Sequence, residues 1–291
     1  GKVNATAFSP NGKLLAAASG VTGLRGTAIL WNPEDGQRIR ELGKGHRDIL
    51  YDVAFSPDGP LLASAGYDRM IKLWNLKDGK LVRTLKGHNG AVYDVAFSPD
   101  GSVLASAGGD SSVKLWKIST GQRLDTFGQP TGEQFNVAFT PDGRHVVYQI
   151  QPFDDWEIYV APTDGSAPPW ALSNEIQHDR YPRWLDAAHV LAAKGEGRHM
   201  RSYVYDLDGG PPLKLFHNNT IRTIAPEYEW ATDADGAKVL IVSERDGDTV
   251  SPERGVYLVD RSSRVTVEQV RTRLEQSLAA ELSLRERGQD A

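Results

Sequence analysis

A short motif returns at a fixed distance along this chain, and that repetition restricts the fold more than any other feature of the sequence. The motif is VAFSPDG or a close variant, and each copy joins an apolar, β-branched stretch to a turn that contains Pro and Gly. Successive phenylalanines of the motif lie 47, 42 and 42 residues apart, which is the length of a unit of four short strands. The four copies lie at residues 6–12, 53–59, 95–101 and 137–143.

Residues 49–87 illustrate how one such unit is built. Four apolar stretches, ILYDVAF, LLASAG, MIKLWNL and LVRTLKG, are separated by turns around Pro57-Asp58-Gly59, Tyr67-Asp68 and Asp78-Gly79. Short β-branched and aromatic runs bounded by turn residues are typical of strands. Four antiparallel strands in about forty residues form the blade of a β-propeller, in which the blades are arranged around an axis.

Weaker repeats continue the series beyond residue 150. Arg183-Trp184 and Glu229-Trp230 take the place of the Ala-Phe pair in the motif, and each leads to a Tyr-containing strand. We therefore predict an all-β fold, a β-propeller of six four-stranded blades that covers residues 1–263. The six repeats are expected to start near residues 3, 49, 91, 134, 180 and 225.

The end of the chain has a different pattern. Val267, Val270, Leu274, Leu278 and Leu282 follow a helical spacing in the last residues. We predict that residues 264–291 form a helical tail or linker with a short C-terminal α-helix. The stretch RVTV at 264–267 is an alternative source of the fourth strand of the last blade, which would shorten that helix.

In the second and third repeats, a His, a Ser, an Asp and a Trp follow one another in the same order at intervals of 18, 4 and 6 residues. With these two sets, the first three repeats resemble the WD40 family. The resemblance covers residues 1–133 and implies that the four side chains form a buried chain of hydrogen bonds from Trp to Asp. The Trp-Asp dipeptide of the family is replaced by Trp-Asn or Trp-Lys in this sequence. The two sets are His46, Ser64, Asp68, Trp74 and His88, Ser106, Asp110, Trp116.

Residues 134–263 resemble instead the WD40-like repeats of TolB-type propellers. The resemblance rests on IYVAPTDGSAPPWALS at 158–173 and YVYDLDGGPPLKLF at 203–216. It implies a bacterial protein of the periplasm or the cell exterior, whereas a simple interaction propeller would suit the bacterial cytoplasm. The sequence leaves the compartment open.

Composition and motifs argue against several classes of function. The net charge is −5 with no long basic tract, which disfavours nucleic-acid binding, and no apolar run is long enough for membrane insertion. The two Ser–His–Asp sets recur at blade spacing without the glycine turn that holds a nucleophilic serine, so we interpret them as structural. No spacing indicates a metal site or a phosphate loop. We expect no catalytic residue, no cofactor and no metal.

One aromatic pattern suggests a place for partner binding. Tyr51, Tyr93 and Phe135 hold the same position in three repeats, four residues before the motif phenylalanine. The WD40 resemblance places this end of the first strand near the face that receives partners, together with Tyr67. Aromatic side chains are common anchors of interfaces, but alternation along the strand also allows these rings to pack between blades. The candidate partner-binding residues are Arg47, Tyr51, Tyr67, Asn89, Tyr93 and Phe135.

Two functions remain from these observations. The first is a non-catalytic scaffold that binds protein or peptide through one face. The alternative is the propeller domain of a larger exported hydrolase, similar to zinc aminopeptidases, whose partner would be a downstream catalytic domain of the same polypeptide.

Overall fold

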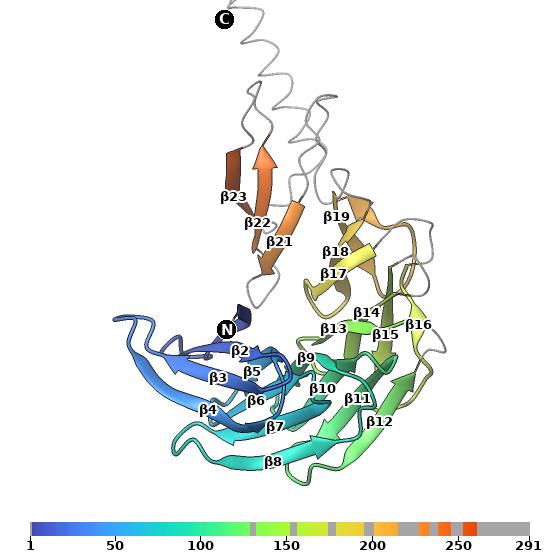
Figure 1. Cartoon of the computed structure of the whole chain (residues 1–291). Coiled ribbons are helices and arrows are strands. Elements are labelled where there is room, and N and C mark those ends of the chain that lie inside the picture. The colour runs from blue at the N-terminus through green and yellow to red at the C-terminus, as the bar shows by residue number, and fades with distance from the viewer. Residues whose placement is uncertain are drawn as a thin grey trace, which may run out of the picture.

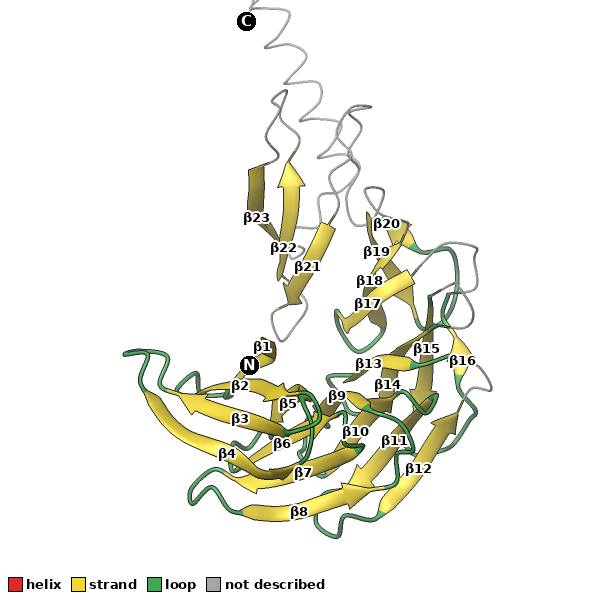
Figure 2. Cartoon of the chain, viewed as in Figure 1, coloured by secondary structure: helices red, strands yellow, loops and turns green. Residues whose placement is uncertain are grey.

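All regular structure in the described part of the chain is β-strand. The computed structural model describes residues 2–128, 132–151, 156–173, 179–194, 201–214, 227–232, 238–245 and 253–260. Within these ranges the strands pair antiparallel with their neighbours in sequence (Figures 1 and 2), which confirms the predicted all-β architecture. These ranges contain no helix of the length and apolar character needed to cross a bilayer.

The strands form six separate sheets among the described residues. Five sheets have four strands in chain order, and the last has three. In sequence order the sheets consist of β1 (Lys2–Phe8), β2 (Leu15–Val21), β3 (Arg25–Trp31), β4 (Arg38–His46); β5 (Leu50–Phe55), β6 (Leu61–Gly66), β7 (Met70–Asn75), β8 (Leu81–Lys86); β9 (Val92–Phe97), β10 (Val103–Gly108), β11 (Ser112–Lys117), β12 (Arg123–Gly128); β13 (Gln134–Phe139), β14 (His145–Ile150), β15 (Glu157–Pro162), β16 (Trp170–Ala171); β17 (Asp179–Trp184), β18 (His189–Lys194), β19 (Arg201–Asp206), β20 (Leu213–Lys214); and β21 (Glu227–Thr232), β22 (Lys238–Arg245), β23 (Glu253–Asp260).

The first five sheets follow one another in an arc. Their first strands β1, β5, β9, β13 and β17 contact in that order, and Figure 1 shows β21–β23 beside the gap between the two ends of the arc. The sheets begin within two residues of the predicted repeat starts. The closed ring of six blades stays a prediction. The predicted tail and its helix, and the boundary at residues 263 and 264, lie outside the described residues.

The hydrophobic core lies between the sheets. Four clusters of buried side chains lie between successive sheets, from the first pair of sheets to the pair formed by the fourth and fifth. Each cluster contains residues from two neighbouring sheets. The central strands carry small residues, such as LASAG in β6 and β10, and are buried on both faces. Small side chains are needed there because each central strand has a neighbouring sheet on either side.

The repeated turn fixes the register of each hairpin between the first two strands. In the second sheet, Gly59 adopts a φ of 84°, a conformation that glycine takes without steric cost. The hydroxyl of Ser56 accepts a hydrogen bond from the N–H of Leu61 across the turn, at 3.0 Å. This turn chemistry recurs in each motif, so the first hairpins of successive sheets have the same orientation. The loops that precede β5, β9 and β13, at the end of the hairpin away from this turn, are therefore oriented alike.

Two aspartates hold these first strands side by side. The carboxylate of Asp52 in β5 accepts a hydrogen bond from the N–H of Val95 in β9, at 3.0 Å. Asp94 in β9 repeats this contact with the N–H of Val137 in β13, at 2.7 Å. Side-chain acceptors therefore link successive sheets, and the loops at their ends come together as one surface.

Candidate functional site

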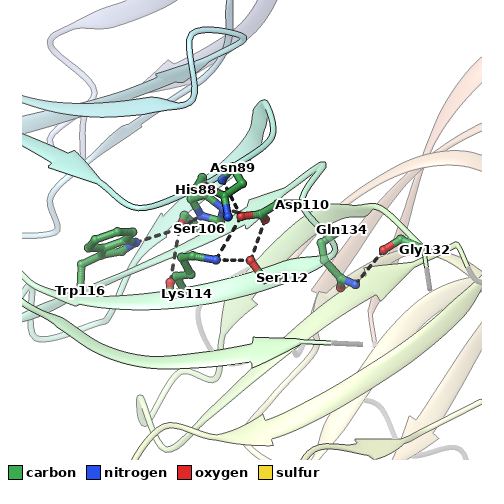
Figure 3. Close-up of polar contacts among 9 residues, drawn as sticks. All are labelled: His88, Asn89, Ser106, Asp110, Ser112, Lys114, Trp116, Gly132 and Gln134. Atoms are coloured by element: carbon green, nitrogen blue, oxygen red, sulfur yellow. Dashed lines mark hydrogen bonds and ion pairs between the residues drawn. The ribbon is translucent and has the colours of Figure 1, made fainter. Parts of the chain in front are cut away.

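A four-residue chain of hydrogen bonds occurs twice, once with three of its residues from the second sheet and once around the third. In the third sheet, Trp116 Nε1 donates to Ser106 Oγ at 2.8 Å, and Ser106 Oγ lies 2.8 Å from His88 Nε2. The other ring nitrogen, Nδ1, lies 2.9 Å from Asp110 Oδ1 (Figure 3). Trp74, Ser64 and Asp68 of the second sheet repeat these contacts with His46, the last residue of β4 in the first sheet, at 2.8, 2.8 and 3.0 Å.

One protonation state satisfies every polar atom of this chain. If the imidazole is neutral with its proton on Nδ1, the serine donates to Nε2, accepts from the indole, and the aspartate accepts from Nδ1–H. Burial lowers the pKa of His88 against the opposing effect of Asp110, which favours this neutral form. Burial alone would raise the pKa of Asp110, but its hydrogen bonds from His88, Ser112 and the N–H of Asn89 lower it well below the ordinary value.

The two serines cannot serve as nucleophiles in this arrangement. Ser64 and Ser106 are both 0% exposed, so no substrate can reach either hydroxyl oxygen. Each oxygen is already shared between an indole N–H and an imidazole nitrogen. Nucleophilic catalysis needs a serine that faces the substrate and an oxyanion site beside it. The geometry therefore agrees with a structural role for both sets, which stays a prediction.

An aromatic row runs across the loop ends of the second, third and fourth sheets. Tyr93 lies 5.2 Å from Tyr51 and 5.1 Å from Phe135 between ring centroids, and it stacks on Phe135 at an angle of 4°. Tyr67 extends the row beyond Tyr51, at 6.4 Å, and Trp156 extends it beyond Phe135, at 4.9 Å. These distances are those of favourable aromatic pairs. The row, defined by these five residues, is the surface-facing aromatic feature that spans three sheets.

The aromatic row is accessible to a partner. Tyr51, Tyr93 and Phe135 are only partly buried, and Tyr67 is 52% exposed. The rings therefore pack on one another between sheets and still present an edge to solvent. Both alternatives considered for these residues, packing between blades and contact with a partner, are compatible with this exposure.

Tyr93 occupies the centre of the row and is fixed by two neighbours. Its hydroxyl donates to Glu133 Oε2 at 3.1 Å, and burial together with that carboxylate raises the pKa of Tyr93 to about 12. Gly109 lies against the ring: a Cβ at this position would be 3.0 Å from the hydroxyl oxygen. A larger residue than glycine at position 109 would require the Tyr93 ring to shift, and the second sheet has Tyr67 at the equivalent position, 42 residues earlier.

A cavity of about 890 Å³ opens beside the aromatic row, between the second and third sheets. Its volume is in the range of ligand-binding pockets. Polar and charged side chains make up much of its wall. The lining residues are Gly45, Arg47, Asp48, Tyr67, Asp68, Arg69, Met70, Lys72, Thr84, Lys86, Asn89, Gly90, Ala91, Tyr93, Gly109 and Glu133.

The structure brings the six predicted partner-binding residues to one region. Arg47, Tyr67, Asn89 and Tyr93 line the cavity, and Tyr51 and Phe135 belong to the aromatic row that borders it.

Sequence reasoning predicted Arg47 but missed Trp156 and the other basic residues of the cavity, Arg69, Lys72 and Lys86. Trp156 lies between the second and third strands of its sheet, as Tyr67 does, and that shared place in the repeat is the signal that would have found it. In the described part of the chain, no group of three His, Cys, Asp or Glu side chains is close enough to hold a metal ion.

Fold and site together define a repeat protein of antiparallel sheets, in which a Trp–Ser–His–Asp hydrogen-bond chain occurs twice and the loops of the second, third and fourth sheets lie on a common face. The family model WD40, described as WD domain, G-beta repeat, matches residues 1–32, 36–75 and 79–117. Residues 1–117 therefore carry WD40 repeats. Each of the last two matched segments begins at the outer strand of one sheet and ends in the third strand of the next.

The curated relatives are similar to this chain over short stretches. Ribosome assembly protein 4 of Saccharomyces cerevisiae is 43% identical over 58 residues, which are 20% of this chain and 11% of that protein. Small ribosomal subunit protein RACK1z of Oryza sativa subsp. japonica is 45% identical over 86 residues, 30% of this chain and 24% of that protein. The Notchless protein homolog of Arabidopsis thaliana is 37% identical over 60 residues, 21% and 13% respectively. The chain thus spans less than a quarter of each of these relatives.

These findings leave some sequence-based expectations unsupported. The family match ends at residue 117, so the TolB-type character of residues 134–263 stays a prediction. The relatives named above come from yeast and plants and give no support to a bacterial origin. They give none to the alternative of an exported peptidase with a downstream catalytic domain.

Proposed function

We propose that this chain is a non-catalytic scaffold that binds protein or peptide partners through the aromatic row and the adjoining cavity. The observation that carries the proposal is the continuity of the row: five aromatic side chains from three successive sheets contact in sequence and remain partly exposed. Aromatic residues are enriched among the few side chains that supply most of the binding energy of interfaces.

The surroundings of the row have the composition of an interface. An apolar aromatic centre is bordered by Arg47 and Asn89, which are exposed and can form hydrogen bonds with a partner. A protein interface commonly has such a hydrophobic centre and polar rim. Nucleic-acid binding and membrane insertion are not part of this proposal, because the chain is acidic overall and has no apolar run long enough to span a bilayer.

The relatives support the same class of function. Their names describe ribosome assembly and a ribosomal subunit protein, and we carry over only the general property of assembly with other proteins. We assign no catalytic role to the chain, because the two Ser–His–Asp sets are used within the sheets.

Photo-crosslinking tests the proposal. A benzophenone amino acid at position 93 is expected to crosslink a partner from a lysate of the source organism, and mass spectrometry identifies it. The same amino acid at Val82, which is 50% exposed on the outer strand β8, is the control and is expected to give no such product.

The identified partner is then purified for a binding measurement. Tyr93→Ala should weaken binding by about tenfold or more, because truncation of an aromatic anchor costs about 2 kcal/mol. Tyr93→Phe keeps the ring and should retain most of the affinity. Unchanged affinity of a folded Tyr93→Ala variant, or crosslinking from position 82 alone, would refute the proposed face.

A further inference from the structure

The cavity contains a buried ammonium group with no acidic partner. Lys72 in β7 is 7% exposed, and its Nζ donates to Thr84 Oγ1 at 3.2 Å. No described carboxylate lies within 4.0 Å of this nitrogen. Burial lowers the pKa of Lys72, the negative charge of Asp68 beyond ion-pair distance raises it, and the positive charges of Lys86 and Arg47 lower it further. A buried cation of this kind is costly unless a negative group pairs with it.

The equivalent lysine of the third sheet forms an ion pair that Lys72 does not form. Lys114 holds the same position 42 residues later, and its Nζ pairs with Asp110 Oδ2 at 3.1 Å and also donates to Ser112 Oγ. Ser112 in turn donates to Asp110 Oδ1 at 2.6 Å. In the second sheet, Met70 stands where Ser112 stands in the third. Without that hydroxyl, Lys72 contacts a threonine and faces the cavity.

The other cations of the cavity wall are also available. The side chains of Arg47, Arg69 and Lys86 line the cavity and form no hydrogen bond or ion pair with any described residue. Arg69 is held at a φ of 66°, which is unfavourable for a side chain of this size.

The carboxylates of the wall are already engaged. Asp68 accepts from His46 and from the N–H groups of Arg47 and Met70. Asp48 accepts from the N–H of Gly23, and Glu133 accepts from Tyr93. The wall carries four cationic side chains and three carboxylates, and these carboxylates already accept hydrogen bonds from the protein, so the donors that the cavity offers to a ligand are mainly cationic.

We propose that this cavity binds an acidic segment of a partner protein, with one carboxylate of that segment paired to Lys72. The inference rests on the proposed function, whose partner it specifies by chemistry. Thr84 Oγ1 accepts from Lys72 and retains its own O–H, so the ammonium and the hydroxyl offer one donor to each oxygen of a carboxylate. Arg47, Arg69 and Lys86 would pair with further acidic residues of the segment, and Tyr67 and Tyr93 would contact its apolar atoms.

A set of labelled probes tests this assignment by fluorescence anisotropy. The probe is a short fluorescein-labelled peptide of alternating Glu and Gly, compared with a Gln–Gly peptide, a phosphoserine–Gly peptide and an oligouridylate. Binding of the Glu peptide, weakened by added salt and at least about tenfold tighter than that of the Gln peptide, is the expected result. Tighter binding of the phosphoserine peptide or of the oligouridylate would overturn the assignment to carboxylates.

Variants in the second and third sheets distinguish binding at Lys72 from a nonspecific attraction of the peptide to positive charge. Lys72→Met should weaken binding of the Glu peptide by about tenfold or more, whereas Lys114→Met, which removes the matched buried lysine, should leave it unchanged. Met70→Ser introduces the hydroxyl found in the third sheet and should draw Lys72 toward Asp68, so binding weakens although no charge is lost. This variant also tests the proposal if Lys72→Met does not fold.

The outcomes distinguish this inference from the proposed function. Equal binding of the Glu peptide by wild type, Lys72→Met and Met70→Ser would refute the role of Lys72. Absence of Glu-peptide binding, with crosslinking from position 93 still observed, would refute only the acidic specificity. Absence of that crosslinking would refute the proposed function itself.

Discussion

Replacement of Asp110 by Ala should destabilise the protein more than the equivalent replacement of Asp68. Asp110 holds the buried imidazole of His88 and also the ammonium of Lys114, whose side chain is 5% exposed. Removal of one partner of a buried ion pair costs about 3–5 kcal/mol, because the other charge remains buried. Asp68 holds His46 without a lysine partner, and loss of such a hydrogen bond costs about 1–3 kcal/mol.

The additional loss of stability in Asp110→Ala should be partly reversed by a second substitution, because it arises from one side chain. In Asp110→Ala the uncompensated charge belongs to Lys114, so adding Lys114→Met should restore about 1–3 kcal/mol of the free energy of unfolding. Lys72→Met on the Asp68→Ala background is the matched control, and it should restore less because no ion pair was broken there.

Urea unfolding provides the measurement. The free energy of unfolding follows from the midpoint and the slope of the transition, with tryptophan fluorescence as the probe. Coincident fluorescence and circular dichroism transitions establish that a two-state description applies. Equal losses for Asp110→Ala and Asp68→Ala, or a further loss when Lys114→Met is added to Asp110→Ala, would refute this account of the two sheets.

Two further substitutions test the packing of the first strands. Burial and the neighbouring Asp94 raise the pKa of Asp52 well above its ordinary value, so its contribution to stability is present at acidic pH, below the unfolded pKa of about 3.9, and is lost as pH rises through the folded pKa. Asp52→Asn should therefore flatten the fall of melting temperature with rising pH, and an unchanged slope would contradict this. Gly66→Ala should cost about 3 kcal/mol, because its Cβ would lie 2.5 Å from the carbonyl oxygen of Ile49. Gly128→Ala, whose nearest such contact is 4.0 Å away, is the control for the same urea measurement and should be nearly neutral.

The sequence predicts the sheets and the hydrogen-bond chains because both depend on local spacing. The turn after each motif fixes the pairing of the first two strands, and strand alternation then determines which side chains share a face. The interval of 18 residues from His88 to Ser106 spans the first strand and half of the next, so its exact recurrence from His46 to Ser64 implies the same contact. Contacts between residues that recur at the repeat spacing can therefore be predicted from the sequence alone.

The remaining features depend on contacts between sheets or on irregular loops. Glu133 meets Tyr93 across 40 residues, and the equivalent position one repeat earlier is Ala91, so no repeated pattern points to that pair. Trp156 follows a loop that is longer than its counterparts in the second and third sheets. The different environments of Lys72 and Lys114 were also not predicted, because the two lysines stand in the same register. The sequence shows Met70 in place of Ser112, but the effect of that change on the contact between the lysine and the aspartate appears only in the structure.

The differences between the second and third sheets indicate where binding specificity lies. The residues that are identical in both sheets, such as His, Ser, Asp and Trp of the hydrogen-bond chain, use their polar groups on one another and leave little for a partner. The turn between β6 and β7 is one of the places where the two sheets differ: Tyr67, Arg69 and Met70 in the second sheet correspond to Gly109, Ser111 and Ser112 in the third. All three of the former line the cavity. Because each sheet must keep the same interior to pack against its neighbours, a specific surface can arise only where the repeats diverge, and this turn between β6 and β7 is such a place.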